Sequence, residues 1–270
     1  MALNSKLEQL KEYLKNLESV VVAFSSGVDS TFLLKVAHDT LGENAIAMTA
    51  KSCSFPKHEH TEATEFCKLN NVKHIIFDFD VFKIKGFKDN SPNRCYLCKK
   101  VLFTKIQQIA KENGIKNVIE GSNLDDEGDY RPGMQAIKEL IIKSPLREIG
   151  FTKQEIRELS KELGLSTFEK PSFACLASRF VYGEKITEEK LKMVDKAEQF
   201  LLDSGFHQIR VRIHSNIARI EVEPDEMQKF MDNRNLIAHK LKEFGFLYVT
   251  LDLLGYRTGS MNETLDMQQL

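Results

Sequence analysis

The feature that most constrains the fold is a short loop of small residues between an apolar run and an amphipathic run. Val20–Phe24 is predicted to be a buried strand, and Val28–Leu41 the helix that follows it. The intervening Ser25-Ser26-Gly27 can curl so that several backbone N–H groups point at one anion. The N-terminus of the helix adds a partial positive charge at the same place. The pattern therefore predicts a phosphate-binding loop.

Side chains around this loop can bind the phosphates of a nucleotide. The hydroxyls of Ser25 and Ser30 can donate hydrogen bonds, and Asp29 can hold Mg²⁺ on a phosphate. The spacing is neither G-x-x-x-x-G-K-[ST] nor G-x-G-x-x-G. A serine-capped helix after a strand is the structural alternative. We predict that Asp29 and Ser30 are catalytic and that the nucleotide-binding residues here are Ala23, Ser25, Ser26, Gly27, Val28, Asp29 and Ser30.

Strands and helices alternate through the first half of the chain. Such alternation predicts an α/β fold, a parallel sheet with helices on both faces and an active site at the carboxyl ends of the strands. From Thr187 the pattern becomes helix, strand, strand, helix, strand, typical of a small α+β domain. The predicted organisation is an ATP-binding and adenylation domain at 1–170, a connection carrying Cys175 at 171–186, and a substrate-binding or oligomerisation domain at 187–270.

The loop resembles the S-G-G-x-D-S loop of the PP-loop ATP pyrophosphatases, with Ser26 in place of the first glycine. Those enzymes cleave ATP between the α and β phosphates and activate a substrate as its adenylate. The resemblance implies ATP and Mg²⁺ as cofactors. It also implies that Thr49, at the end of the second strand, lies at the adenine edge. Gly121 and Asp125 follow the fourth strand, where Asp125 could share Mg²⁺ with Asp29.

Three of the five cysteines suggest chemistry beyond nucleotide binding. Cys95 and Cys98 form a C-x-x-C pair at the start of a predicted helix, and Cys175 lies in the connection between the domains. Cys67 is interpreted as a small core residue. Zinc would need a fourth ligand, a thioredoxin-like pair would need a different fold context, and simple catalytic thiols stay possible. Three cysteines on a [4Fe–4S] cluster would leave one iron open for an extra sulfide.

Longer motifs indicate a particular family. Most of the chain resembles the LarE-type sulfurtransferases, which build the nickel-pincer nucleotide used by lactate racemase. The resemblance rests on RCYLCKK, GSNLDD, SPLREIGFTKQEIR, KPSFACLASRF, VRIHSNIARIE and LDLLGYRTGSMNE. It implies that ATP adenylates the carboxylates of pyridinium-3,5-dicarboxylate mononucleotide, that a sulfur nucleophile then displaces AMP, and that two rounds give the dithio product.

The resemblance implies two alternative sulfur sources. In one branch a cysteine matching Cys175 gives up its own sulfur and becomes dehydroalanine. In the other, three cysteines hold a [4Fe–4S] cluster that passes on a sulfide from an external donor. Because this chain has Cys95 and Cys98 as well as Cys175, the cluster branch is favoured.

The family's second-domain arginines imply a site for the substrate phosphate. The candidates here are Arg210, Arg212 and Arg257, because guanidinium forks suit a phosphomonoester. Arg179, four residues beyond Cys175, is a further candidate for contact with the adenylate or substrate. Glu198 and Glu221 are weaker candidates for a divalent metal site, since a solvated helix face would explain Glu198 equally well.

The charge and hydropathy of the chain limit the kinds of binding partner that we expect. The net charge is −1, and residues 185–270 hold 12 Lys and Arg against 14 Asp and Glu, which argues against nucleic acid. No apolar run approaches the roughly 20 residues that cross a bilayer. The N-terminus predicts an amphipathic helix rather than a signal peptide, so we expect a cytoplasmic protein without a membrane partner. The family resemblance implies a homo-oligomer, with a hexamer as one possibility.

Three rival functions stay open. A cluster-dependent PP-loop tRNA thiolase would share the loop and the cysteines, but it would usually carry a basic appendage. An amidotransferase-fed ligase of the NAD or GMP synthetase kind would need no set of three cysteines. A non-enzymatic, nucleotide-binding redox sensor would bind ATP without releasing pyrophosphate when an acceptor is present.

Overall fold

The computed structural model describes residues 3–126, 132–171 and 173–263. Five residues of the polar loop after Gly121, at 127–131, and Ser172 of the KPSFACLASRF motif lie outside these ranges. The chain divides into two compact units. Unit 1 comprises Met1–Ser52, Lys57–Asp80 and Cys95–Ser172, and unit 2 comprises Cys53–Pro56, Val81–Arg94 and Phe173–Leu270.

Unit 1 is built on a parallel sheet of four strands in the order β3-β2-β1-β4. The strands are β1 (Val20–Ala23), β2 (Ala45–Lys51), β3 (His74–Asp78) and β4 (Asn117–Ile119). All three strand pairs are parallel, and Ile119 also pairs with Lys143 at the edge beyond β4. The α/β prediction for this half of the chain is confirmed.

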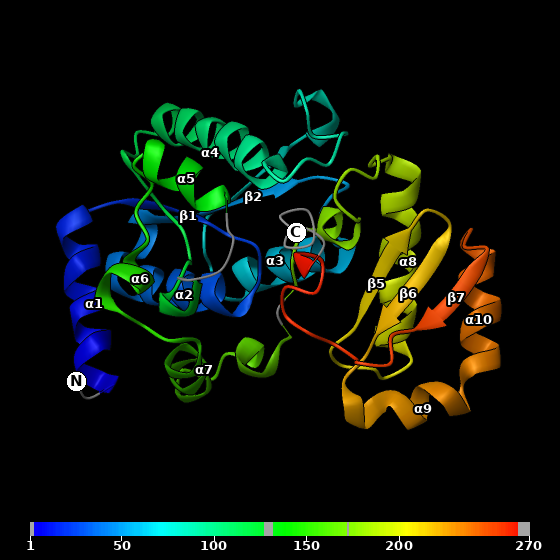
Figure 1. Cartoon of the computed structure of the whole chain (residues 1–270). Coiled ribbons are helices and arrows are strands. Elements are labelled where there is room, and N and C mark those ends of the chain that lie inside the picture. The colour runs from blue at the N-terminus through cyan, green and yellow to red at the C-terminus, as the bar shows by residue number, and fades with distance from the viewer. Residues whose placement is uncertain (1–2, 127–131, 172, 264–270) are drawn as a thin grey trace. The chain divides into compact units, whose positions relative to one another are not determined.

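Helices cover both faces of this sheet, as Figure 1 shows. Val20 and Val22 of β1 belong to one apolar core and Val21 belongs to another, because successive side chains of a strand point to opposite faces. The helices α4 and α5 lie over one face, while α1, α2, α3, α6 and α7 contribute to the other. These helices are α1 (Leu3–Leu17), α2 (Val28–Leu41), α3 (Lys57–Leu69), α4 (Arg94–Glu112), α5 (Gly133–Glu139), α6 (Pro145–Ile149) and α7 (Lys153–Glu162).

The N-terminal helix α1 confirms the amphipathic pattern. Leu10 and Leu14 are fully buried in the core shared with α2. The helix α7, which also contributes to this core, begins with a capping box. Thr152 Oγ1 accepts a hydrogen bond from the backbone N–H of Glu155, and Glu155 accepts one in return from the N–H of Thr152. Within the described residues, no helix is both long enough and apolar enough to span a bilayer.

Unit 2 has the predicted α+β character. Its mixed sheet has the order β5-β6-β7, with β5 and β6 antiparallel and β6 and β7 parallel. The buried face of α8 supplies Leu191, Val194, Ala197 and Leu201 to the interior. The elements are α8 (Glu188–Asp203), β5 (Arg210–His214), β6 (Ile217–Glu221), α9 (Met227–Asp232), α10 (Arg234–Glu243) and β7 (Tyr248–Leu251).

Two short segments from the first half of the sequence belong to unit 2. The Leu176 N–H donates to the carbonyl of Ser54 at 2.8 Å, and the Ile186 N–H donates to the carbonyl of Lys88 at 2.9 Å. The buried Asn90 side chain donates to the carbonyl of Val181 at 2.7 Å. The residues that follow Cys175 are therefore held by chain that lies 91 to 122 positions earlier.

Candidate active site

The predicted phosphate loop adopts a tight turn between β1 and α2. Ser26 has φ of +56°, in the left-handed region that favours glycine, and its side chain is buried. Its hydroxyl donates to the carbonyl of Glu59 at 3.0 Å. Ser26 thus occupies the position where the PP-loop pattern has glycine. The hydrogen bond from its hydroxyl supplies a contact that glycine could not make.

The two other serines of the loop contact each other across the turn. Ser25 Oγ and Ser30 Oγ lie 3.2 Å apart, and Ser30 Oγ donates to the carbonyl of Gly27 at 3.2 Å. Gly121 packs against the same turn, since a Cβ at this position would lie 3.0 Å from the Ser30 nitrogen. Only glycine lets the backbone after β4 approach the first turn of α2 so closely. The predicted residues Ser25, Ser30 and Gly121 therefore lie together.

Asp29 and Asp125, the two predicted Mg²⁺ ligands, are joined by one lysine. Lys153 Nζ lies 2.5 Å from Asp29 Oδ2, and the backbone N–H of Lys153 donates to Asp125 Oδ2 at 2.7 Å. Asn123 Nδ2 donates to the other oxygen of Asp29 at 3.2 Å. About a quarter of the Asp29 and Lys153 side chains is exposed, so a ligand can reach both.

The sequence interpretation missed Lys153, although one signal could have revealed it. Lys153 is the first residue of α7, directly after the Thr152 N-cap. A cation is electrostatically unfavourable at a helix N-terminus, so a lysine there implies a nearby anion. Asp29 is that anion in the structure, and a bound polyphosphate could replace it.

Lys170 is a second cation beside the loop that the sequence interpretation missed. Its ammonium group donates to the Ser26 carbonyl at 3.0 Å and forms an ion pair with Glu62. It belongs to the KPSFACLASRF motif, five residues before Cys175. Lys153 and Lys170 therefore supply two positive charges to a loop whose own sequence contains none.

The predicted adenine-edge residue Thr49 uses its hydroxyl within the protein. Thr49 Oγ1 donates to the carbonyl of Phe24 at 2.8 Å and lies 2.8 Å from His74 Nε2. Thr49 is buried in β2 and links Phe24, the residue after β1, to His74, the first residue of β3. Any contact from Thr49 to a base would therefore come from its main chain.

Two of the three cysteines of interest, Cys95 and Cys98, lie in the same helix, and Cys175 lies elsewhere in the chain. Cys95 and Cys98 are half-buried and one turn apart in the first turn of α4, so their side chains share a helix face. Cys175 is also half-buried and belongs to unit 2. Across the described ranges, no group of three or more His, Cys, Asp or Glu side chains is arranged to hold a metal ion. Cys67 is a core residue as predicted, and burial raises the pKa of its thiol to about 12.

In unit 2, Arg94, the residue before Cys95, forms a hydrogen bond with the segment after Cys175. Arg94 is buried, donates to the carbonyl of Ala177 at 2.9 Å and is hydrogen-bonded to Asn90. Its guanidinium also lies 5.9 Å from the centre of the Tyr182 ring. These contacts fix the backbone two residues beyond Cys175.

Arg179, a candidate for substrate contact, forms a buried fork with Glu198. The side chain of Arg179 is fully buried, and its Nε and Nη2 donate to the two carboxylate oxygens of Glu198 at 2.8 and 2.9 Å. Glu198 also accepts from the N–H of Val211 at 2.9 Å. Burial raises the pKa of Glu198, but the charges of Arg179 and Arg210 and these hydrogen bonds outweigh burial, so the pKa lies below its usual range.

The other predicted arginines also have partners within unit 2. Arg212 is buried and pairs with Glu221 at 2.9 Å. Arg210 lies under the Tyr256 ring at 5.1 Å, and burial together with the charge of Arg179 lowers its pKa to about 10. Arg257 is more exposed and pairs with Asp252 at 3.4 Å. Glu198 and Glu221, the two predicted metal ligands, thus each bind an arginine.

Comparison with known proteins then decides the family. No family model matches the chain. It is 38% identical over 269 residues to the pyridinium-3,5-bisthiocarboxylic acid mononucleotide synthase of Lactiplantibacillus plantarum, covering 99% of this chain and 98% of that protein. The chain belongs to this family of LarE-type sulfurtransferases.

Two further proteins are similar to this LarE-type chain. It is 43% identical over 265 residues to an uncharacterised protein of Synechocystis, covering 97% of this chain and 99% of that protein. It is 26% identical over 211 residues to one component of the glutamine-hydrolysing GMP synthase of Thermoplasma volcanium, covering 72% of this chain and 67% of the relative. The LarE-type chain is therefore an enzyme that uses ATP and Mg²⁺, with the PP-loop fold seen in unit 1.

Proposed function

We propose that this LarE-type enzyme activates the carboxylates of pyridinium-3,5-dicarboxylate mononucleotide with ATP and converts them to thiocarboxylates. The full-length similarity to the named synthase carries this proposal, and the phosphate loop with its two flanking lysines supports it. A carboxylate oxygen attacks the α-phosphorus of ATP, and pyrophosphate leaves. A sulfur nucleophile then attacks the acyl carbon, and AMP leaves with the former carboxylate oxygen.

The residues around the loop have distinct roles in this proposal. The loop N–H groups and the hydroxyls of Ser25 and Ser30 bind phosphate oxygens, while Asp29 and Asp125 hold Mg²⁺. Bound Mg²⁺ would offset negative charge on the polyphosphate, and the ammonium of Lys153, beside Asp29, would bind the leaving pyrophosphate. Charge that develops on pyrophosphate is then stabilised by groups already in place.

For the sulfur carrier we propose a [4Fe–4S] cluster with Cys95, Cys98 and Cys175 as ligands, fed by a sulfide donor. The support is the number of cysteines and the position of two of them on one helical turn. When bound, such a cluster would supply an open iron for the transferable sulfide. Donation of the sulfur atom of Cys175 itself is the alternative, and it would consume one protein chain per sulfur.

Arg210, Arg212 and Arg257 are proposed to bind the substrate phosphate, with Arg179 near the adenylate. Their present partners are carboxylates, a backbone carbonyl and aromatic rings, which an incoming phosphate would have to displace or share. Glu198 and Glu221 remain weaker candidates for a metal. A homo-oligomer in the cytoplasm stays a prediction.

The test is an anaerobic assay with ATP, Mg²⁺, the pyridinium dicarboxylate nucleotide and sulfide. We expect AMP and pyrophosphate to form only with acceptor, and we expect the product to gain the mass of sulfur in place of oxygen. Asp29→Asn should abolish pyrophosphate release. Asp39→Asn is the matched control, because Asp39 lies on the same helix and pairs with Lys35 one turn earlier.

Two outcomes would refute parts of this function. Pyrophosphate release at the wild-type rate in the Asp29→Asn variant would remove the proposed Mg²⁺ role. Thiolation of tRNA, with no reaction of the nucleotide, would favour the tRNA thiolase.

Iron and sulfide analysis of wild type and Cys95→Ala tests the proposed sulfur carrier separately. A colourless, iron-free and active protein would leave Cys175 as the sulfur donor.

A further inference from the structure

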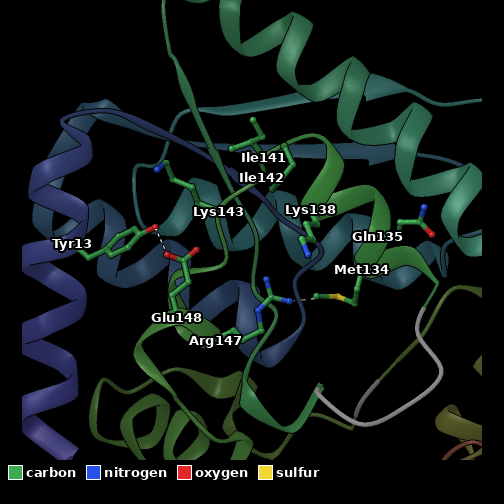
Figure 2. Close-up of a pocket in the computed structure, with 9 residues that line it drawn as sticks. All are labelled: Tyr13, Met134, Gln135, Lys138, Ile141, Ile142, Lys143, Arg147 and Glu148. Carbon is green, nitrogen blue, oxygen red and sulfur yellow. Dashed lines mark hydrogen bonds between the residues drawn. The ribbon is translucent and has the colours of Figure 1, made fainter.

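Unit 1 carries a hollow of about 650 Å³ that none of the roles above uses. Figure 2 shows its lining, which comes from α1, α5, α6 and the stretch between the last two helices. Its volume falls within the range of roughly 300–1,000 Å³ that is usual for small-molecule sites. The hollow is therefore large enough to hold a small ligand.

Three cationic side chains line this hollow: Lys138, Lys143 and Arg147. Among the described residues, none of the three lies within 4.0 Å of a carboxylate oxygen. Arg147 donates instead to the hydroxyl of Ser144 at 3.3 Å, and its other terminal nitrogen lies 4.0 Å from the sulfur of Met134. In Figure 2 the charged ends of Lys138 and Arg147 both point into the middle of the hollow.

Glu148, an acidic side chain of the lining, is already engaged by other groups. One of its oxygens accepts from Tyr13 Oη at 2.8 Å, and the other accepts from the backbone N–H of Ser144 at 3.0 Å. Burial and the neighbouring Glu148 carboxylate raise the pKa of Tyr13 well above its usual value, so Tyr13 stays a donor at neutral pH. Counted with Glu148, the lining keeps two positive charges in excess.

The remaining lining is partly apolar. Met134, Ile141 and Ile142 contribute hydrocarbon or sulfur surface, and the side chain of Ile141 is 82% exposed. Apolar surface beside a cluster of cations suits a ligand that has both an anionic group and an apolar body. The guanidinium fork of Arg147 and the ammonium of Lys138 suit a phosphate dianion, whereas in Figure 2 the ammonium of Lys143 points away from these two groups.

We propose that this hollow is a second ligand site of the enzyme, and that it binds an organic phosphomonoester. The phosphate contacts Arg147 and Lys138, Lys143 adds positive charge to the lining, and the organic body packs on Met134 and Ile141. The lining shares no residue with the nucleotide and cysteine positions described above. The proposal is therefore independent of which sulfur carrier the enzyme uses.

Phenyl phosphate is a suitable probe, because it joins a phosphate monoester to an apolar ring. The full-length protein is first saturated with Mg²⁺ and a non-hydrolysable ATP analogue, which fills the phosphate loop. Titration with phenyl phosphate is then followed by calorimetry and by phosphorus NMR. We expect saturable binding that is tighter than the binding of inorganic phosphate.

Two variants locate the binding, and one controls for charge. The double variant Lys138→Gln/Lys143→Gln removes two ammonium groups that hold no carboxylate of the described chain, so folding should be unchanged, and affinity should fall about tenfold or more. Arg147→Gln should act in the same direction. Lys73→Gln/Lys116→Gln removes two exposed lysines elsewhere in unit 1 and should bind as wild type does.

Several results would overturn the proposal. One is the absence of saturable binding to the wild-type protein. Another is wild-type affinity in Lys138→Gln/Lys143→Gln, because the anion would then bind elsewhere, for example at the arginines of unit 2. Equal affinity for inorganic phosphate and phenyl phosphate would overturn the part that assigns an organic body to the ligand.

Discussion

At the scale of single residues, the phosphate loop shows what a local pattern can and cannot predict. The sequence placed Ser25, Gly27 and Ser30 at a turn between a strand and a helix, and the structure has this turn. Ser26 departs from the expected glycine, yet it adopts the left-handed backbone that glycine would take. The two lysines beside the loop lie 124 and 144 positions beyond their partners in the chain, so no local pattern could have identified Asp29 and Ser26 as those partners.

The first prediction concerns Lys153. Replacing it with methionine keeps the length of the side chain but removes the charge that would meet pyrophosphate. We expect acceptor-dependent pyrophosphate release to fall by about tenfold or more, since one preorganised charge at a developing anion is typically worth that much. The measurement is the rate of pyrophosphate formation over a range of MgATP concentrations.

Lys161→Met is the matched control for this variant. Lys161 is exposed in the last turn of the same helix, where its ammonium lies 5.5 Å from the centre of the Phe168 ring. It should release pyrophosphate at close to the wild-type rate. If Lys153→Met does so too, Lys153 has only its structural contact with Asp29, and the proposed role in the reaction is wrong.

At the scale of elements, the sequence predicted most helices and strands because their apolar periods are regular. The helix at Val28–Leu41 was predicted with the bounds that α2 has, and the strand predicted at Val20–Phe24 differs from β1 by one residue. Segments 53–56 and 81–94 were not assigned to unit 2, because hydrogen bonds over a long sequence separation hold them there. The pairing of such segments leaves no periodic signal in either partner.

The second prediction concerns the N-terminus of α7. Thr152→Ala removes the hydroxyl that caps the N–H of Glu155, and we expect a loss of about 1 kcal/mol in the free energy of unfolding. Lys153 follows directly, so a frayed first turn should also weaken its contacts with Asp29 and Asp125. Urea unfolding and pyrophosphate release are measured on the same preparations.

Thr152→Ser keeps the capping oxygen and should restore most of the stability. A Thr152→Ala protein as stable as wild type would mean that Glu155 alone holds this turn, through its ion pair with Lys6 at 2.7 Å. The comparison of the two variants separates the effect of the cap from the effect of a smaller side chain.

At the scale of the whole molecule, the charged interior of unit 2 was the least predictable feature. Arg210 and Arg212 were predicted to bind the substrate phosphate and Arg179 to contact the adenylate or substrate, and the structure places all three in buried positions with partners of their own. A sequence shows that a side chain carries charge. Whether that side chain is buried depends on tertiary packing by residues far away in the sequence. Two half-buried histidines, His74 in unit 1 and His214 in unit 2, have a lowered pKa, and we predict that they contribute to the pH dependence of stability.

Folding lowers the pKa of both imidazoles. The Thr49 hydroxyl donates its one hydrogen bond to the Phe24 carbonyl, so His74 Nε2 must donate to the Thr49 oxygen. Burial, then the charge of His60, lowers the pKa of His74. In unit 2, Arg219 Nε donates to His214 Nε2 at 3.1 Å, which requires that nitrogen to be unprotonated. Burial and Arg219 lower the pKa of His214 more than Glu184 and Glu221 raise it.

The sign of the pH dependence follows from these directions. Near pH 6.5 the unfolded chain takes up protons at both histidines, while the folded chain takes them up only at lower pH. The contribution of these two histidines to the free energy of unfolding is therefore complete above about pH 6.5. It is lost as the pH falls below that value. The urea midpoint should drop between about pH 7.5 and about pH 5.5, a range that lies above the titration of ordinary carboxylates. His74→Gln/His214→Gln should flatten this drop, because glutamine does not titrate. A wild-type midpoint that stays constant over the range, or an equal drop in the double variant, would show that these histidines do not set the response.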